Sequence, residues 1–167
     1  MLLEGHIMTV MSGLIGPEGR GIQHTQGAQM PTTRSLERLN ADLPPFMTLL
    51  EGQVIDMNLV DQSATLAFRV SEQFCHSGDV VQGGFITAML DAAMSHAVFA
   101  CDSSVVNLSS LEISTRYLEI TRAGALEAVG RIVRLSHKTA FLDGQLFNAD
   151  GLLVATTHSV AKIYRKP

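Results

Sequence analysis

The feature that most constrains the fold of this chain is one long apolar segment, residues 83–101. It opens with two glycines, and the polar residues after them are Thr87, Asp91, Ser95 and His96. A helix that is apolar on nearly every face is stable only when it is buried. We therefore expect a long helix in the interior of the protein, enclosed by a sheet.

Strand-like patterns flank this segment on both sides. Apolar and polar residues alternate at 55–59 and 66–70 around a turn at 61–63, which predicts a hairpin. Further strands are predicted near 108–118, 126–135, 139–147 and 152–164. A short helix is expected to start at Pro45 and to stop at Gly52. About six strands and one buried helix indicate an α+β fold, in which an antiparallel sheet curls around the helix.

The length of 167 residues favours a single domain. Residues 1–40 are rich in glycine and methionine and lack periodicity, so we expect a flexible N-terminal arm or leader there. Organised structure is expected from Leu43, within one domain at 41–167.

Charge and cysteine content exclude several classes of protein. The 12 Lys and Arg residues form no basic cluster and the net charge is −4, which argues against nucleic-acid binding. The apolar stretches are too interrupted anywhere in the chain to make a membrane span. Cys75 and Cys101 lack the spacing of a disulfide framework or a zinc site. These features favour a soluble, cytoplasmic protein without a metal.

Asp91 is the anomaly of the apolar helix. Burying an unpaired carboxylate costs several kcal/mol, so Asp91 must be hydrogen-bonded, neutralised or exposed to a ligand cavity. Thr87 and Ser95 lie four residues to either side, on the same helical face, and we expect them to help satisfy it. From the residues alone, a structural role and a functional role for Asp91 remain open.

Gly83-Gly84 places unpaired backbone N–H groups at the start of the same helix, where they could polarise a carbonyl oxygen or simply permit a tight turn. Gly83 and Asp91 are eight residues apart, or about 12 Å along a helix. A single carbonyl group needs both partners within about 3 Å. If Gly83 and Asp91 act on the same carbonyl group, they must come from two copies of the chain. This predicts a two-fold homodimer in which each Gly83 meets the other copy's Asp91.

The run Phe74-Cys75-His76-Ser77-Gly78-Asp79-Val80-Val81-Gln82-Gly83-Gly84-Phe85-Ile86-Thr87-Ala88-Met89-Leu90-Asp91 resembles the signature of the PaaI-like, hotdog-fold acyl-CoA thioesterases. In that signature a His or Gln precedes two glycines, and an Asp follows eight residues after the first glycine. The resemblance extends over residues 43–162. It implies the hotdog fold, hydrolysis of an acyl-CoA thioester without a cofactor, and a dimer that pairs into a dimer of dimers.

The resemblance also assigns roles by position. Asp91 corresponds to the nucleophile or general base, and the Gly83 N–H to the donor that binds the thioester oxygen. Gln82 stands where many members have His. Ser110 matches a residue that holds the attacking water, with Ser109 as the alternative if the alignment shifts by one.

The remaining substrate-binding assignments are weaker. His76 stands where the family usually has Asn, and Gly84 accompanies Gly83 at the helix start. Arg122, His137 and Lys138 lie in turns where the family meets coenzyme A, although exposed basic residues in turns commonly contact only solvent.

His96 lies on another face of the helix from Asp91 and is interpreted as a hydrogen-bonded histidine of the core or of an interface. Two other functions stay open. A hotdog dehydratase or hydratase pairs a histidine with an acid on the helix, as His76 and Asp91 would do. A non-catalytic acyl-CoA-binding protein is the other alternative.

Overall fold

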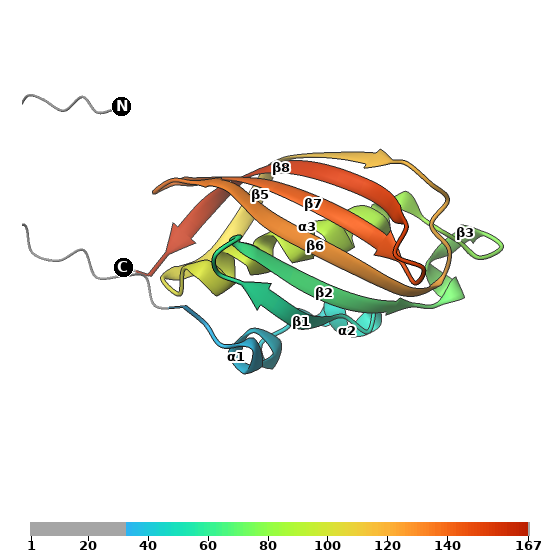
Figure 1. Cartoon of the computed structure of the whole chain (residues 1–167), viewed down its shortest axis with the longest axis horizontal. Coiled ribbons are helices and arrows are strands. Elements are labelled where there is room, and N and C mark those ends of the chain that lie inside the picture. Colours follow the sequence, from blue (N-terminus) through green and yellow to red (C-terminus); the bar gives the residue numbers. More distant parts are fainter. Residues whose placement is uncertain (1–32, 167) are drawn as a thin grey trace, which may run out of the picture.

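A six-stranded antiparallel sheet wraps around one long helix in the computed structural model, which describes residues 33–166 (Figure 1). The elements in chain order are α1 (Leu36–Ala41), α2 (Pro45–Leu49), β1 (Gln53–Asn58), β2 (Ser63–Val70), a 3-10 turn η1 (Glu72–Phe74), β3 (Cys75–Ser77), β4 (Val80–Val81), α3 (Gly83–Cys101), β5 (Val105–Tyr117), β6 (Gly124–Leu135), β7 (Thr139–Asn148) and β8 (Leu153–Arg165). The predicted α+β architecture is confirmed.

The sheet has the strand order β1-β2-β6-β7-β8-β5. Every neighbouring pair is antiparallel, and β3 and β4 form a separate small hairpin beside the start of α3. The strand that follows α3 therefore pairs only with β8 and occupies an edge of the sheet. The strands expected at 126–135, 139–147 and 152–164 agree closely with β6, β7 and β8, whereas β5 begins three residues before the predicted residue 108.

The central helix α3 is the core of the fold, as its composition predicts. Met89, Leu90, Ala93 and Met94 have no exposed surface. The helix packs tightly against the sheet at Gly130 of β6, where an added Cβ would lie 2.2 Å from the carbonyl carbon of Ala93. By length and composition alone α3 also passes as a candidate membrane span, but it is the mostly buried core helix of this domain.

Residues 34–42 are organised, in contrast to the expected onset of structure at Leu43. Ser35 caps α1, and Leu39 of this helix is 5% exposed. The Asn40 side chain accepts a hydrogen bond from the Val54 N–H at 2.9 Å and donates one to the Val54 carbonyl at 2.8 Å. A six-residue helix with one buried side chain is too short to show a periodic pattern. The rest of the expected arm, residues 1–32, lies outside the described residues.

Candidate functional site

Asp91 projects from the middle of α3 toward the edge strand β5. Its Oδ1 atom accepts a hydrogen bond of 2.8 Å from the Ser110 hydroxyl, and its side chain is half-buried. Ser110 lies in β5 immediately before an irregularity in its pairing with β8, between Ser110 and Glu112. The contact joins two residues that are 19 positions apart in the sequence.

Only one of the two candidate serines makes this contact. Successive side chains of a strand point to opposite faces of the sheet, so Ser109 and Ser110 cannot both face α3. Ser109 is exposed, pairs across the strands with Lys162, and makes no side-chain hydrogen bond within residues 33–166. The geometry therefore favours Ser110 over Ser109 as the partner of Asp91.

The prediction that Thr87 and Ser95 hydrogen-bond to Asp91 is wrong. The Thr87 hydroxyl donates to the Thr115 hydroxyl at 3.0 Å and lies 3.0 Å from the Tyr117 hydroxyl. A threonine has one O–H donor, and in Thr87 it is directed to β5. Ser95 makes no hydrogen bond to Asp91 among the described residues. The carboxylate is satisfied across the helix–strand gap instead.

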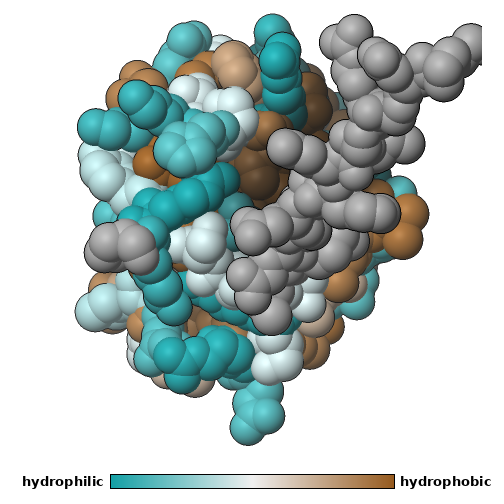
Figure 2. Space-filling view, turned by 90° about the vertical axis from the view of Figure 1, so that its left-hand side faces the viewer, coloured by the Kyte–Doolittle hydropathy of each residue, from teal (hydrophilic) through white to brown (hydrophobic). Residues whose placement is uncertain are grey.

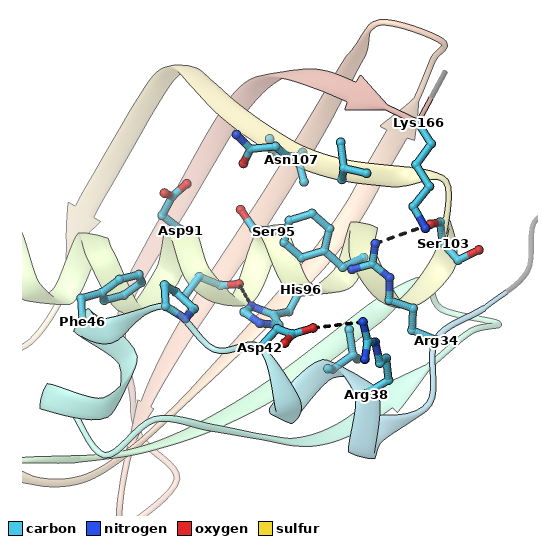
Figure 3. A pocket seen from close by; sticks show the side chains of 16 residues that line it. Arg34, Arg38, Asp42, Phe46, Asp91, Ser95, His96, Ser103, Asn107 and Lys166 are labelled. Atoms are coloured by element: carbon cyan, nitrogen blue, oxygen red, sulfur yellow. Dashed lines mark hydrogen bonds and ion pairs between the residues drawn. The ribbon is translucent and has the colours of Figure 1, made fainter.

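A cavity of about 610 Å³ opens beside Asp91 (Figure 3). We call it the Asp91 cavity. Its walls come from α3, from the start of β5 and from α1 with the residues around it, and Lys166 stands at its rim. Residues that line it include Arg34, Arg38, Phe46, Asp91, Ser95, His96, Phe99, Asn107 and Leu108. In Figure 3 the Asp91 and Ser95 side chains both point away from the helix axis toward β5.

The start of α3 lies at a different hollow, of about 460 Å³, which we call the Gly83 cavity. The Gln82 side-chain oxygen accepts a 3.1 Å hydrogen bond from the Gly83 N–H, and the Tyr117 hydroxyl donates to the Gly83 carbonyl at 2.9 Å. His76 and Thr121 line this cavity as well. Gly83 and Asp91 therefore open into separate cavities of one chain.

The flanking candidates divide between these locations. His76 is exposed on β3, and its Nδ1 atom lies 2.7 Å from the Ser77 hydroxyl oxygen. Gly84 is exposed, and an added Cβ there would meet no atom within 4 Å. Both are close to Gly83 in sequence and space, whereas neither lines the Asp91 cavity.

The three basic candidates are exposed and do not meet within one chain. Arg122 forms an ion pair with Asp79 and lies beside β4, near the start of α3. His137 and Lys138 occupy the turn between β6 and β7, where the His137 carbonyl accepts a hydrogen bond from Arg165. That turn lies toward the end of the molecule where α3 finishes (Figure 1).

His96 is 6% exposed, and its Nδ1 atom lies 2.8 Å from the Ala92 carbonyl oxygen. Burial lowers the pKa of this imidazole, which favours the neutral ring. His96 is thus a buried histidine with a backbone hydrogen-bond partner, as the core interpretation predicts, and it also lines the Asp91 cavity. Within residues 33–166, no cluster of three or more His, Cys, Asp or Glu side chains could hold a metal ion.

Sequence reasoning gave no role to Arg34, Phe46, Tyr117 or Thr121. Arg34 falls in the expected arm, and Phe46 was assigned only to a short helix. Tyr117 lies two residues from Thr115 on the face of β5 that meets α3, so strand alternation was the signal that could have identified it. Thr121 is 2% exposed, and its hydroxyl is the one buried side-chain polar atom without a partner within the described residues.

Comparison with known proteins is consistent with this geometry. Residues 78–155 match the family model of the thioesterase superfamily. A phenylacetic acid degradation-related protein of Ralstonia eutropha has a similar structure, with a TM-score of 0.68, 27% identity, and coverage of 73% of this chain and 92% of that one. A search of curated proteins finds no match.

Two more distant structures share the fold. A mutant thioesterase of Pseudomonas aeruginosa has a TM-score of 0.71 at 24% identity and covers 81% of this chain and 97% of its own. The PaaI protein of the phenylacetic acid degradation operon of E. coli has a TM-score of 0.63 at 19% identity, with coverage of 72% and 85%. Residues 78–155 thus match the thioesterase superfamily, and the sheet-wrapped helix around them is consistent with the hotdog fold of these thioesterases.

Proposed function

We propose that this protein hydrolyses acyl-CoA thioesters, with Asp91 as the catalytic carboxylate. The observation that carries the proposal is the 2.8 Å hydrogen bond between Ser110 and Asp91 at the wall of an open cavity. The family supplies the thioester as the reacting group. The acyl-CoA substrate and the roles of individual residues belong to the proposal.

Asp91 has two routes to the products. As a general base it takes a proton from water, and the oxygen of that water attacks the thioester carbonyl carbon. As a nucleophile it attacks that carbon itself and forms a mixed anhydride, which water then hydrolyses. In both routes the carbon–sulfur bond breaks, the thiolate leaves and is protonated, and the free acid is formed.

Ser110 supports the charged form of Asp91. The Ser110 hydroxyl donates its hydrogen to the carboxylate. The lone pairs of the Ser110 oxygen stay available to accept a hydrogen bond from a water molecule. A water held there would lie next to Asp91, the group that would remove its proton. Ser110 is thus proposed to orient the water and to stabilise the carboxylate.

A complete site requires a second copy of the chain. Gly83 and Asp91 are about 12 Å apart along α3 and open into different cavities, so one copy does not present both to one carbonyl group. An antiparallel pair of α3 helices around a two-fold axis would bring the Gly83 of each copy to the Asp91 of the other. We propose a homodimer with two such sites, and its pairing into a dimer of dimers remains a proposal from family resemblance.

The Gln82 side chain would yield its position when substrate binds. It now accepts from the Gly83 N–H, the donor that the thioester oxygen would use. A substrate carbonyl oxygen that replaces the Gln82 side-chain oxygen would accept a hydrogen bond from the Gly83 N–H. The freed Gln82 side-chain amide could then donate a hydrogen bond to the thioester. Residues Gly84 and His76 border this position, and Arg122, His137 and Lys138 are proposed to meet coenzyme A.

The proposal is tested by thiol release from short, medium, long and aromatic acyl-CoAs with Asp91→Asn. This change keeps the size of the side chain and removes its charge and basicity, so turnover should fall by about two powers of ten or more. Asp150→Asn, in an exposed turn outside both cavities, is the matched control and should retain normal turnover. Undiminished hydrolysis by Asp91→Asn would remove Asp91 from the mechanism.

The shared site is tested by mixing two inactive variants. Asp91→Asn and Gly83→Pro damage different halves of the site, so a heterodimer of the two contains one intact site. Random exchange of subunits in an equal mixture should therefore restore about a quarter of the wild-type activity. An active monomer in sedimentation, or no recovery after subunit exchange is verified, contradicts the shared site.

A further inference from the structure

The end of the Asp91 cavity that lies away from Asp91 carries positively charged side chains. Arg34 lies at the far side from Asp91, with its guanidinium carbon 5.3 Å from the centre of the Phe99 ring. It also donates to the backbone carbonyl of Val105, which anchors it at the start of β5. Lys166, which follows β8, stands at the same end of the cavity (Figure 3).

These two cations lack acidic partners within the part of the chain that the structure describes. The cavity is lined by three cationic side chains and two carboxylates. Arg38 pairs with Asp42 at 3.2 Å, and the other carboxylate, Asp91, is bonded to Ser110. Arg34 and Lys166 therefore leave an excess of positive charge at this end.

Between the two ends, Phe99, Val106 and Leu108 give the cavity an apolar lining beside the polar side chains of Ser95, His96 and Asn107. Figure 2, which shows the side of the molecule that lies to the left in Figure 1, has hydrophobic side chains deep in a hollow with hydrophilic side chains around them. A ligand that matches this cavity has an apolar middle and a negatively charged end.

We propose that the acyl group of the substrate carries a carboxylate at its far end, so that the preferred substrate is a dicarboxylic acid bound to coenzyme A through one of its carboxyl groups. This inference rests on the proposed thioesterase function, which places the thioester next to Asp91. The distal carboxylate would meet Arg34 and Lys166.

The dimensions of the cavity set the length of this acyl group. Phe99, which lies under Arg34, is eight residues beyond Asp91, or about 12 Å along the helix. Contacts of about 3 Å at each end leave about 6 Å for the chain. An extended chain advances about 1.2 Å per bond, which gives about five bonds and a diacid of about six or seven carbons.

The test compares adipoyl-CoA with hexanoyl-CoA, which have the same number of acyl carbons and differ in the distal carboxylate. Wild-type protein should have a kcat/KM about tenfold or more higher for adipoyl-CoA, because a charge-assisted hydrogen bond to the half-buried Arg34 favours the anion. Equal values, or a preference for hexanoyl-CoA, would overturn the inference.

Three variants locate the effect. Lys166→Gln should reduce the adipoyl preference about two- to fivefold, as expected for an exposed charge. Arg34→Gln should reduce it about tenfold, and Arg34→Lys, which keeps the charge, should restore part of it. Arg69→Gln removes an exposed positive charge outside the cavity and should leave the preference unchanged. A loss of the adipoyl preference in Arg69→Gln, or an undiminished preference in Arg34→Gln and Lys166→Gln, contradicts the assignment of these cations to the distal carboxylate.

The phosphates of coenzyme A are the other possible source of negative charge. The adipoyl preference and its reduction in Lys166→Gln should persist with the adipoyl and hexanoyl thioesters of pantetheine, which lack these phosphates. Both acyl-CoAs carry the same phosphates, so cations that bind the phosphates would make Arg34→Gln and Lys166→Gln lower kcat/KM equally for both acyl-CoAs. That equal loss, absent with the pantetheine thioesters, would overturn the inference.

A binding measurement separates this inference from the proposed function. Calorimetry with Asp91→Asn should show tighter binding of adipoyl-CoA than of hexanoyl-CoA even without turnover. If the wild type binds with this preference but hydrolyses neither ester, the proposed function fails while the assignment of the cavity stands. If it hydrolyses both without preference, the assignment fails and the proposed function stands.

Discussion

Replacing Gly83 with proline removes the one N–H group on which the proposed oxyanion site depends. Gly83 is the first residue of α3, a position where proline is well tolerated. Gln82 has φ −61° and ψ 130°, the extended conformation that a residue before proline adopts. The helix should therefore form in Gly83→Pro, and loss of a single oxyanion donor typically lowers the rate about 100- to 1,000-fold.

The structure also shows why proline needs a matched control. A Cβ at position 83 would lie 2.9 Å from the hydroxyl oxygen of Tyr117, so any side chain there forces Tyr117 to move slightly. Gly83→Ala introduces the same Cβ and retains the N–H. The rate of Gly83→Ala should exceed that of Gly83→Pro by about a hundredfold.

The assay is thiol release under saturating acyl-CoA, with circular dichroism and sedimentation to verify the fold and the dimer. Gln82→Ala should have a milder effect than Gly83→Pro, because its side chain orients the substrate and does not carry the developing charge. Equal rates for Gly83→Pro and Gly83→Ala in folded dimers would refute the oxyanion assignment and leave crowding against Tyr117 as the cause.

Three further predictions concern stability. Gly130→Ala should lower the free energy of unfolding by about 1–3 kcal/mol or more in urea titrations, because its Cβ would lie 2.2 Å from the backbone of α3. The control is Gly84→Ala, whose Cβ would meet no atom within 4 Å and which should not be destabilised. Burial lowers the pKa of His96 from 6.5, so below that pH the unfolded chain binds a proton that the folded chain does not. The free energy of unfolding should therefore fall as pH drops below about 6.5, by up to about 1.4 kcal/mol per pH unit. In His96→Phe this dependence on pH should be weaker, and an unchanged dependence would exclude His96 as its cause. Removal of residues 1–30, which lie outside the described residues, should leave cooperative unfolding and thiol release largely intact, and loss of either would make that segment part of the domain.

The sequence predicted the parts of the fold that depend on long, regular patterns. The mostly apolar run of α3 and the alternation in β6, β7 and β8 extend over ten or more residues each, so burial dominates their conformation. The helix α1 was missed because its attachment depends on Leu39 and on the side-chain hydrogen bonds of Asn40 to Val54, 14 residues away.

The candidate site was predictable where residues share one element or one motif. Gly83 and Asp91 could be placed from helix geometry, and Ser110 from family resemblance. The partner of Asp91 was predicted wrongly because Thr87 is a neighbour along the helix, whereas the hydroxyl that reaches the carboxylate comes from β5. Contacts between elements depend on the register and tilt of a strand over a helix, which residue spacing does not give.

The position of Lys166 at the rim of the Asp91 cavity has a practical consequence for handling the protein. An affinity tag fused after Pro167 would begin two residues beyond this lysine, close enough for its side chains to reach the cavity mouth. A polyhistidine tag would add imidazoles beside the residues proposed to receive the acyl group. Kinetic comparisons of acyl-CoAs therefore call for protein from which any C-terminal tag has been cleaved.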